Sequence, residues 1–212
     1  MTPRPPRLPP DEQRDAIIDA ARKLLAEQGH DRLRVVSVAN ELGMSHANVY
    51  RFFPSREALM DAIVESWLAY SRAEVKEIAT RSEPPLNRLR AIVLSMHRNA
   101  KRRFREEPNV SELYEHLHGR RAESARQHIA LLYGLGRELL REAAETGELA
   151  VKDLDAALRL VHAATAKFTT PRLIRESLDE DTMTQLSQVL DALLLAFRTD
   201  PELLERSHPD AR

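Results

Sequence analysis

Side chains that can hydrogen-bond to the edges of nucleic-acid bases gather on one short segment, where a core helix would carry leucine. After Gly43 the chain reads SHANVYRFFPSREAL, and a helix that begins near Ser45 would expose polar and small residues on one face. Such side chains suit the major groove of DNA, with Tyr50 and Arg56 placed to reach the phosphate backbone. The residues of this face are His46, Ala47, Asn48, Tyr50 and Arg51.

Two short helices that meet at Gly43 must position this face. Glycine permits the left-handed backbone with which one helix ends before another begins at a steep angle. Ser45 can cap the second helix by accepting an amide hydrogen bond, and the positive end of a helix suits a phosphate. This pattern is typical of a helix-turn-helix whose second helix reads DNA. The apolar contacts expected between the helices are Val38, Ala39 and Leu42 with Val49 and Phe53.

The distribution of charge limits any DNA-binding surface to a small patch. The chain of 212 residues has a formal net charge of −1, unlike a protein that coats nucleic acid non-specifically. The segment from Leu42 to Arg56, however, contains two arginines and no acidic residue. The alternative interpretation is an ordinary corner between two helices with a solvated polar face. The N-terminal arm carries Arg4 and Arg7, which either enter a minor groove or belong to a disordered leader.

Helical patterns fill the rest of the chain, and no segment alternates apolar and polar residues for long enough to predict a strand. The expected fold class is therefore all-α. Helices are expected over 11–28, 35–42, 55–80, 153–170 and 179–198, with another between the prolines at 84–85 and 108. Gly29 and Gly147 are expected to end helices, and Asp153 to cap one.

Several classes of function have no residues to support them. The chain contains no cysteine, no nucleophile elbow, no Walker loop and no HExxH motif, so we expect neither an enzyme nor a cofactor. Glu112 and His116 are one helical turn apart but lack a third metal ligand, so no metal site is predicted. The run KRRFREE from Lys101 to Glu107 is interpreted as a solvated helix end. Without an apolar span or signal peptide, a soluble cytoplasmic protein is expected.

The stretch LGMSHANVYRFFPSREALMDAIV resembles the DNA-binding segment of TetR-type (tetracycline-repressor family) regulators, and the resemblance extends from about Asp11 to Val64. It implies a third helix that reads operator bases, and Val36 occupies a position on the second helix where some members carry a base-reading arginine. The residues implied for base contacts are Ser45, His46, Ala47, Asn48, Tyr50 and Arg51. Those implied for phosphate contacts are Arg34, Ser37, Tyr50 and Arg56.

The resemblance also implies the domain organisation and a homodimer. We expect a disordered arm at 1–10, a helix-turn-helix domain at 11–56, a helical ligand-binding and dimerisation domain at 57–200, and a tail at 201–212. The stretch 147–171 is similar to the closing region of one TetR subgroup, whose last two long helices pair between subunits. The residues expected at this interface are Leu154, Leu158, Val161, Met183, Leu186, Leu190, Leu193, Leu194 and Phe197.

A mostly apolar pocket for an apolar or amphipathic small molecule is a further implication of the resemblance. Its candidate residues, each of which a core position would also explain, are Trp67, Tyr70, Met96, His97, Tyr114, Leu117, His128, Tyr133, His162 and Phe168. The predicted function is a ligand-responsive transcriptional regulator, in the form of a repressor released from a palindromic operator. A helical dimerisation or adaptor protein without DNA binding, and a helical metal-binding protein, are the alternatives.

Overall fold

The computed structural model describes residues 9–120 and 122–205, and within these ranges every regular element is a helix, which confirms the all-α class. None of the described helices is long and apolar enough to cross a membrane. The first helices are α1 (Pro10–Gln28), the 3-10 helix η1 (His30–Arg32), α2 (Val35–Glu41), α3 (His46–Phe52) and α4 (Arg56–Ala79). They are followed by α5 (Pro85–Glu106), α6 (Pro108–Gly119), α7 (Glu123–Glu145), α8 (Leu154–Thr169), α9 (Pro171–Glu176) and α10 (Thr182–Thr199).

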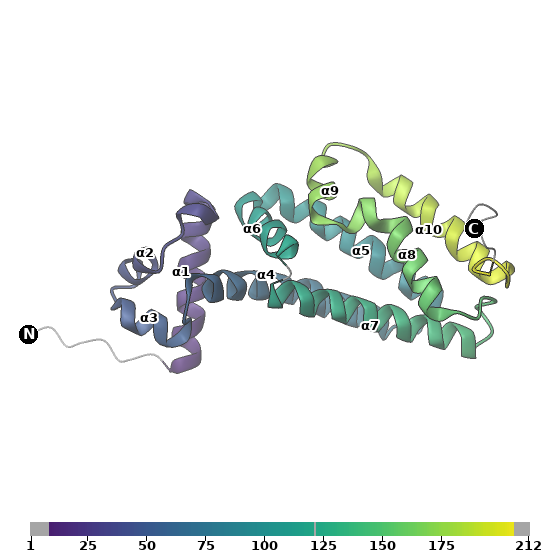
Figure 1. Cartoon of the computed structure of the whole chain (residues 1–212), viewed down its shortest axis with the longest axis horizontal. Helices are drawn as coiled ribbons and strands as arrows, with labels where there is room; N and C mark the ends of the chain where they lie inside the picture. Colours follow the sequence, from purple (N-terminus) through teal and green to yellow (C-terminus); the bar gives the residue numbers. More distant parts are fainter. Residues whose placement is uncertain (1–8, 121, 206–212) are drawn as a thin grey trace, which may run out of the picture. The chain divides into compact units, whose positions relative to one another are not determined.

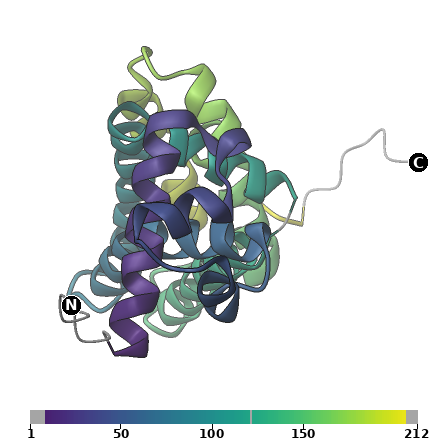
Figure 2. The same cartoon turned by 90° about the vertical axis from the view of Figure 1, so that its left-hand side faces the viewer.

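The chain forms two compact units, and the first consists of Met1–Trp67 with Glu107–Ala125. In this unit α1 packs against α2 and α6, and α2 packs against α3 (Figure 1; Figure 2 shows α1 in purple beside them). Ile17, Ile18 and Leu25 are buried on the inner side of α1 at helical spacing. The side-chain amide of Asn109 donates to the carbonyl of Ala26 at 2.7 Å, which ties α6 to the end of α1.

The second unit consists of Leu68–Glu106 with Arg126–Arg212, and its core lies between α5, α7, α8 and α10. The helix α5 packs against α8, α9 and α10. Asp153 caps α8 as predicted, because its carboxylate accepts from the amide of Ala156 at 2.8 Å. Core residues from these helices include Leu86, Leu89, Ile92, Leu139, Leu140, Ala143, Ala157, Val161, Leu194 and Phe197.

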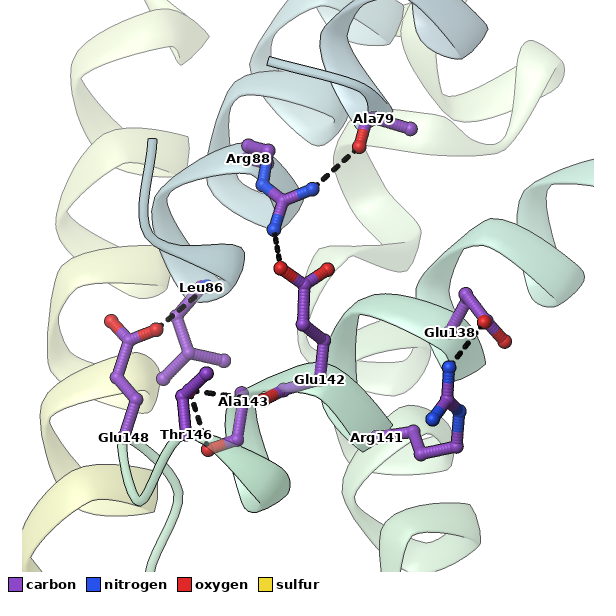
Figure 3. Close-up of polar contacts among 9 residues, drawn as sticks. All are labelled: Ala79, Leu86, Arg88, Glu138, Arg141, Glu142, Ala143, Thr146 and Glu148. Atoms are coloured by element: carbon purple, nitrogen blue, oxygen red, sulfur yellow. Dashed lines mark hydrogen bonds and ion pairs between the residues drawn. The ribbon is translucent and has the colours of Figure 1, made fainter. Parts of the chain in front are cut away.

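Polar contacts fasten the beginning of α5 to the end of α7 (Figure 3). Arg88 is only 6% exposed; its guanidinium donates to the carbonyl of Ala79 at 2.7 Å and pairs with Glu142. The amide of Leu86 donates to the carboxylate of Glu148 at 3.1 Å, which satisfies a donor that the first turn of a helix leaves without a partner. These contacts therefore tie the first turn of α5 to the ends of α4 and α7.

The structure divides the chain differently from the expected boundary after residue 56. The first unit continues through Trp67 and also takes in α6, because Arg22 pairs with Glu107 and the ring of His30 lies 5.2 Å from that of His116. Tertiary contacts of this kind join segments that are far apart in the sequence. At the other end, Leu203 and Leu204 pack against the core of the second unit, so the expected tail begins later than residue 201. Residues 1–8 of the expected arm, with Arg4 and Arg7, lie outside the described residues, and Pro10 at its end already belongs to α1.

Candidate nucleic-acid interface

The corner between α2 and α3 has the predicted local geometry. Gly43 has a φ of +60°, the left-handed conformation that lets α2 end before α3 begins. The hydroxyl of Ser45 accepts from the amide of Asn48 at 3.3 Å, which confirms the predicted N-cap. The two helices share a buried apolar contact, which fixes the direction of the outer face of α3. Of the predicted contact residues, Val38, Ala39 and Val49 are 0% exposed, Phe53 is 3% exposed, and Leu42 is half-buried.

The outer face of α3 is left uncovered by its own unit. Tyr50 is 47% exposed, and the guanidinium of Arg51 lies over the ring of Phe52 at 5.1 Å from the centroid. This stacking supports the Arg51 side chain along an aromatic surface, and its Nη2 also donates to Oε1 of Gln13 at 3.5 Å. Asn48 is half-buried, with its side-chain amide 3.7 Å from the sulfur of Met44. The other predicted residues of this face that lie exposed are Ser45, His46 and Ala47.

The predicted phosphate contacts do not all have the same surroundings. Arg34 is exposed beside the beginning of α2, and Ser37 is half-buried in its first turn. Arg56, in contrast, is half-buried and engaged with the main chain: its Nε donates to the carbonyl of Leu33 at 2.7 Å, and its Nη2 donates to the carbonyl of His30. The geometry therefore gives Arg56 a positioning role, since it fastens the segment that leads into α2 to the start of α4.

The candidate pocket residues are divided between the two units. Trp67, Tyr114 and Leu117 belong to the first unit, whereas the others belong to the second. The structure brings several of them together as separate ring pairs, which are Trp67 with Tyr114 at 5.3 Å, His97 with Phe168 at 5.8 Å, and Tyr133 with His162 at 5.2 Å. Tyr70 and Tyr133 are surface residues at 58% and 37% exposure, His162 is exposed, Met96 is half-buried, and His128 is buried.

His97 is a core residue whose two ring nitrogens both have hydrogen-bond partners. A core position is the alternative to a pocket position for each of the candidate pocket residues. It is 0% exposed, and its Nδ1 lies 2.9 Å from the carbonyl of Phe168, which can only accept, so Nδ1 carries the proton. Its Nε2 then accepts from the hydroxyl of Thr182 at 2.8 Å, and that oxygen accepts from Lys101 at 3.2 Å. Burial, above all, and the nearby charge of Lys101 hold the pKa of His97 below its ordinary value, so the ring is neutral.

The residues expected at a dimer interface divide between core and surface. Val161, Leu186, Leu190, Leu194 and Phe197 are buried within the chain itself, and none of them is more than 4% exposed. Burial of this kind follows from the broad apolar stripe of α10, most of which packs on α5 and α8. The half-buried members are Leu154, Leu158, Met183 and Leu193. Leu195, which is not among the expected residues, is 58% exposed on α10.

Comparison with known proteins places both parts of the chain in one family. The family model "Bacterial regulatory proteins, tetR family" matches residues 17–63, and the model "Tetracyclin repressor-like, C-terminal domain" matches residues 85–190. An uncharacterised HTH-type transcriptional regulator of Bacillus subtilis, YuxN, is 27% identical over 88 residues, which are 42% of this chain and 30% of YuxN. The chain thus spans less than a third of that relative's length.

Solved structures share the fold over nearly the whole chain. A structure described as the molecular basis for control of antibiotic production by bacterial hormones is 27% identical, with a TM-score of 0.60 over 88% of this chain and 98% of that one. RolR in complex with resorcinol is 20% identical, with a TM-score of 0.60 over 95% and 97% of the two chains. Because the second family model alone matches half of the sequence, the chain belongs to the tetR family of bacterial transcriptional regulators.

Proposed function

We propose that this protein binds a palindromic DNA operator as a homodimer, represses transcription there, and is released by a small molecule. The observation that carries the DNA-binding part is the outer face of α3, where polar side chains are exposed over a buried apolar contact with α2. No acidic side chain occurs between Leu42 and Arg56 to repel phosphate. Repression, rather than activation, follows the resemblance to tetracycline repressors.

Each side chain of this face has a role in the proposal. Exposed Arg51 donates to a guanine or another acceptor on a base edge, as arginine does in major grooves. Arg34 and Ser37 contact phosphate at the beginning of α2, and Tyr50 contacts phosphate from α3. The remaining base contacts are assigned to Ser45, His46, Ala47 and Asn48. Arg56 acts indirectly, through the two carbonyls that it holds.

The proposed dimer uses the outer faces of α8 and α10. Leu195 is 58% exposed, and Ala163 and Ala192 are exposed on the same two helices, where small side chains permit close packing between helices. The half-buried Leu154, Leu158, Met183 and Leu193 would lose their remaining exposed surface there. Two reading helices about one DNA turn apart, roughly 34–36 Å, would then face the two halves of a palindrome.

Release requires that the small molecule bind two states of the protein unequally. Each tenfold preference for the state with lower operator affinity weakens DNA binding by about 1.4 kcal/mol, and DNA weakens binding of the small molecule by the same factor. The structure of RolR, which has the same fold, contains bound resorcinol. This supports the proposal that the present chain also responds to a small molecule. The helix α4 contributes residues to both units and is the proposed carrier of the change.

The test is a comparison of Arg51→Ala with a charge-matched control, Arg141→Ala. Arg141 is exposed on α7, where it pairs with Glu138 and Glu145. A DNA site is first selected from random sequences with the wild-type chain. We expect Arg51→Ala to weaken binding to this site by about 1–3 kcal/mol and to relax preference at one base pair, whereas the control keeps wild-type affinity. Equal effects of both variants would contradict the proposal, and an adaptor protein would show no salt-dependent binding at all.

A further inference from the structure

A second candidate binding site lies in the C-terminal unit, where α5 faces the beginning of α10. It is a pocket of about 560 Å³, large enough for a metabolite of moderate size. One wall consists of the end of α5 from Arg98 onward, and the other consists of the segment that leads into α10 and the first residues of α10. The lining residues are Arg98, Lys101, Arg102, Arg105 and Glu106 on the first wall, and Glu180, Asp181, Thr182 and Met183 on the second.

The wall formed by α5 is a stripe of positive charge. Arg98, Lys101, Arg102 and Arg105 follow one another at spacings of three, one and three residues, which places them on one face of the helix. No acidic residue precedes Glu106 on α5. The run from Lys101 to Glu107 is therefore more than a solvated helix end, because part of it lines the pocket.

Two of these cations are held by neutral groups. The ammonium of Lys101 donates to the carbonyls of Ser177 at 3.1 Å and Glu180 at 2.5 Å, in addition to Thr182. Arg105 donates to the carbonyl of Leu178 at 2.5 Å. Among the described residues, neither cation forms an ion pair with a carboxylate. A carbonyl accepts a hydrogen bond but cancels no charge, so both cations keep their full formal charge at the pocket.

Three acids, Glu106, Glu180 and Asp181, line the pocket together with its four cations, which leaves one positive charge in excess. Glu180 is paired with Lys167 at 3.2 Å, so its charge is shared with a cation that does not line the pocket. Glu106 lies 3.9 Å from Arg102, a loose pair in the exposed last turn of α5. Burial and the neighbouring Arg105 hold the pKa of Lys101 below its ordinary value, despite the acids nearby.

We propose that this pocket binds a small molecule through a phosphate or carboxylate group. Lys101 supplies charge but has all three N–H donors engaged, so the direct donors to the anion are the guanidinium groups of Arg102 and Arg105. Arg98 lies beside them and also pairs with Glu74 at 3.5 Å. An effector role for the bound molecule rests on the proposed function, whereas the existence of the anion site does not depend on it. Lys101 and Arg105 also fasten the segment from Ser177 to Glu180 to α5, which fixes the second wall relative to the first.

The experiment is calorimetric titration of the full chain with two probes, pyrophosphate and citrate, at constant ionic strength set with sodium chloride. Constant ionic strength removes the general screening effect of a multivalent salt. Sucrose serves as the uncharged probe. We expect saturable binding of at least one anion. The anion that binds with the higher affinity shows whether the site prefers a phosphate or a carboxylate group. Absence of saturable binding by both anions overturns the inference.

Variants then locate the binding. The double substitution Arg102→Gln with Arg105→Gln is expected to lower the affinity for the anion at least about tenfold, since charge-assisted contacts are lost. Arg105→Lys keeps the charge and is expected to retain most of the affinity, which separates loss of the site from loss of the fold. Arg141→Gln removes an exposed arginine elsewhere on the same unit and is the matched control. Equal weakening by the control, or wild-type affinity in the double variant, contradicts the assignment.

DNA binding is measured separately on the wild-type chain without probe. Anion binding at the pocket without sequence-specific DNA binding would leave the anion site standing and overturn the proposed function. Sequence-specific DNA binding without anion binding would overturn the anion site alone. The two failures are therefore distinguishable.

Discussion

Replacement of Arg56 discriminates between a residue that contacts phosphate and one that positions α2. The Arg56 guanidinium donates to the carbonyls of Leu33 and His30, and Leu33 is 0% exposed. In Arg56→Ala both carbonyls lose a charged donor. A hydrogen bond to a charged group contributes about 1.5–3 kcal/mol, and the half-buried position of Arg56 reduces this, so we expect a total loss of about 2–4 kcal/mol.

A phosphate contact would give a different result. Loss of one such contact makes the slope of log affinity against log salt shallower by about 0.9, with little change in stability. We expect the opposite for Arg56→Ala: a lower free energy of unfolding and an unchanged salt slope for the folded protein. Arg56→Lys is expected to recover part of the stability, because lysine keeps the charge but not the fork of donors.

The assay combines urea unfolding, followed by circular dichroism at fixed protein concentration, with DNA titrations at several salt concentrations. Arg34→Ala is the comparison, since Arg34 is exposed and is assigned a phosphate contact. It is expected to leave stability within about 0.5 kcal/mol of wild type and to make the salt slope shallower. Unchanged stability in Arg56→Ala together with a shallower slope would refute the positioning role.

Three further predictions follow from local geometry. Ser45→Asp keeps an N-cap and should leave stability nearly unchanged in urea unfolding, while its negative charge lowers affinity in a DNA titration. His97 has a lowered pKa in the folded protein, so the unfolded state binds its proton more tightly. Its contribution to the free energy of unfolding is therefore full above about pH 6.5 and falls below that pH by up to about 1.4 kcal/mol per pH unit. In His97→Gln, the free energy of unfolding should depend less on pH between about pH 7.5 and 5.5. Gly134→Ala, in open space on α7, should raise the unfolding free energy by about 0.5–1 kcal/mol, whereas Gly136→Ala should not, because its Cβ would lie 2.8 Å from Leu158 Cδ1.

Features set by neighbouring residues could be predicted from the sequence. The left-handed Gly43, the cap at Ser45 and the cap at Asp153 each depend on a few adjacent residues, and the structure has all three. The exposed face of α3 could be predicted for the same reason, since helical spacing alone separates it from buried Val49. What these exposed side chains contact stays a prediction.

Features set by residues far apart in the chain could not be predicted. The carbonyls that engage Arg56 lie 23 and 26 residues before it, and no local pattern marks a carbonyl as an acceptor. The same holds for Lys101, whose acceptors lie 76 to 81 residues later. A list of aromatic and histidine residues cannot distinguish a pocket from a core, because both use the same side chains; His97 belongs to the core.

The claim that the face of α3 reads DNA sequence is tested most directly by competition. The full chain is titrated against a DNA site selected from random sequences, at two salt concentrations and with an excess of unrelated DNA. We predict binding that resists the competitor at both salt concentrations, with two protomers, or a multiple of two, on each site. The claim would be contradicted if unrelated DNA displaced the protein from the selected site at the same competitor concentration as unlabelled copies of that site do.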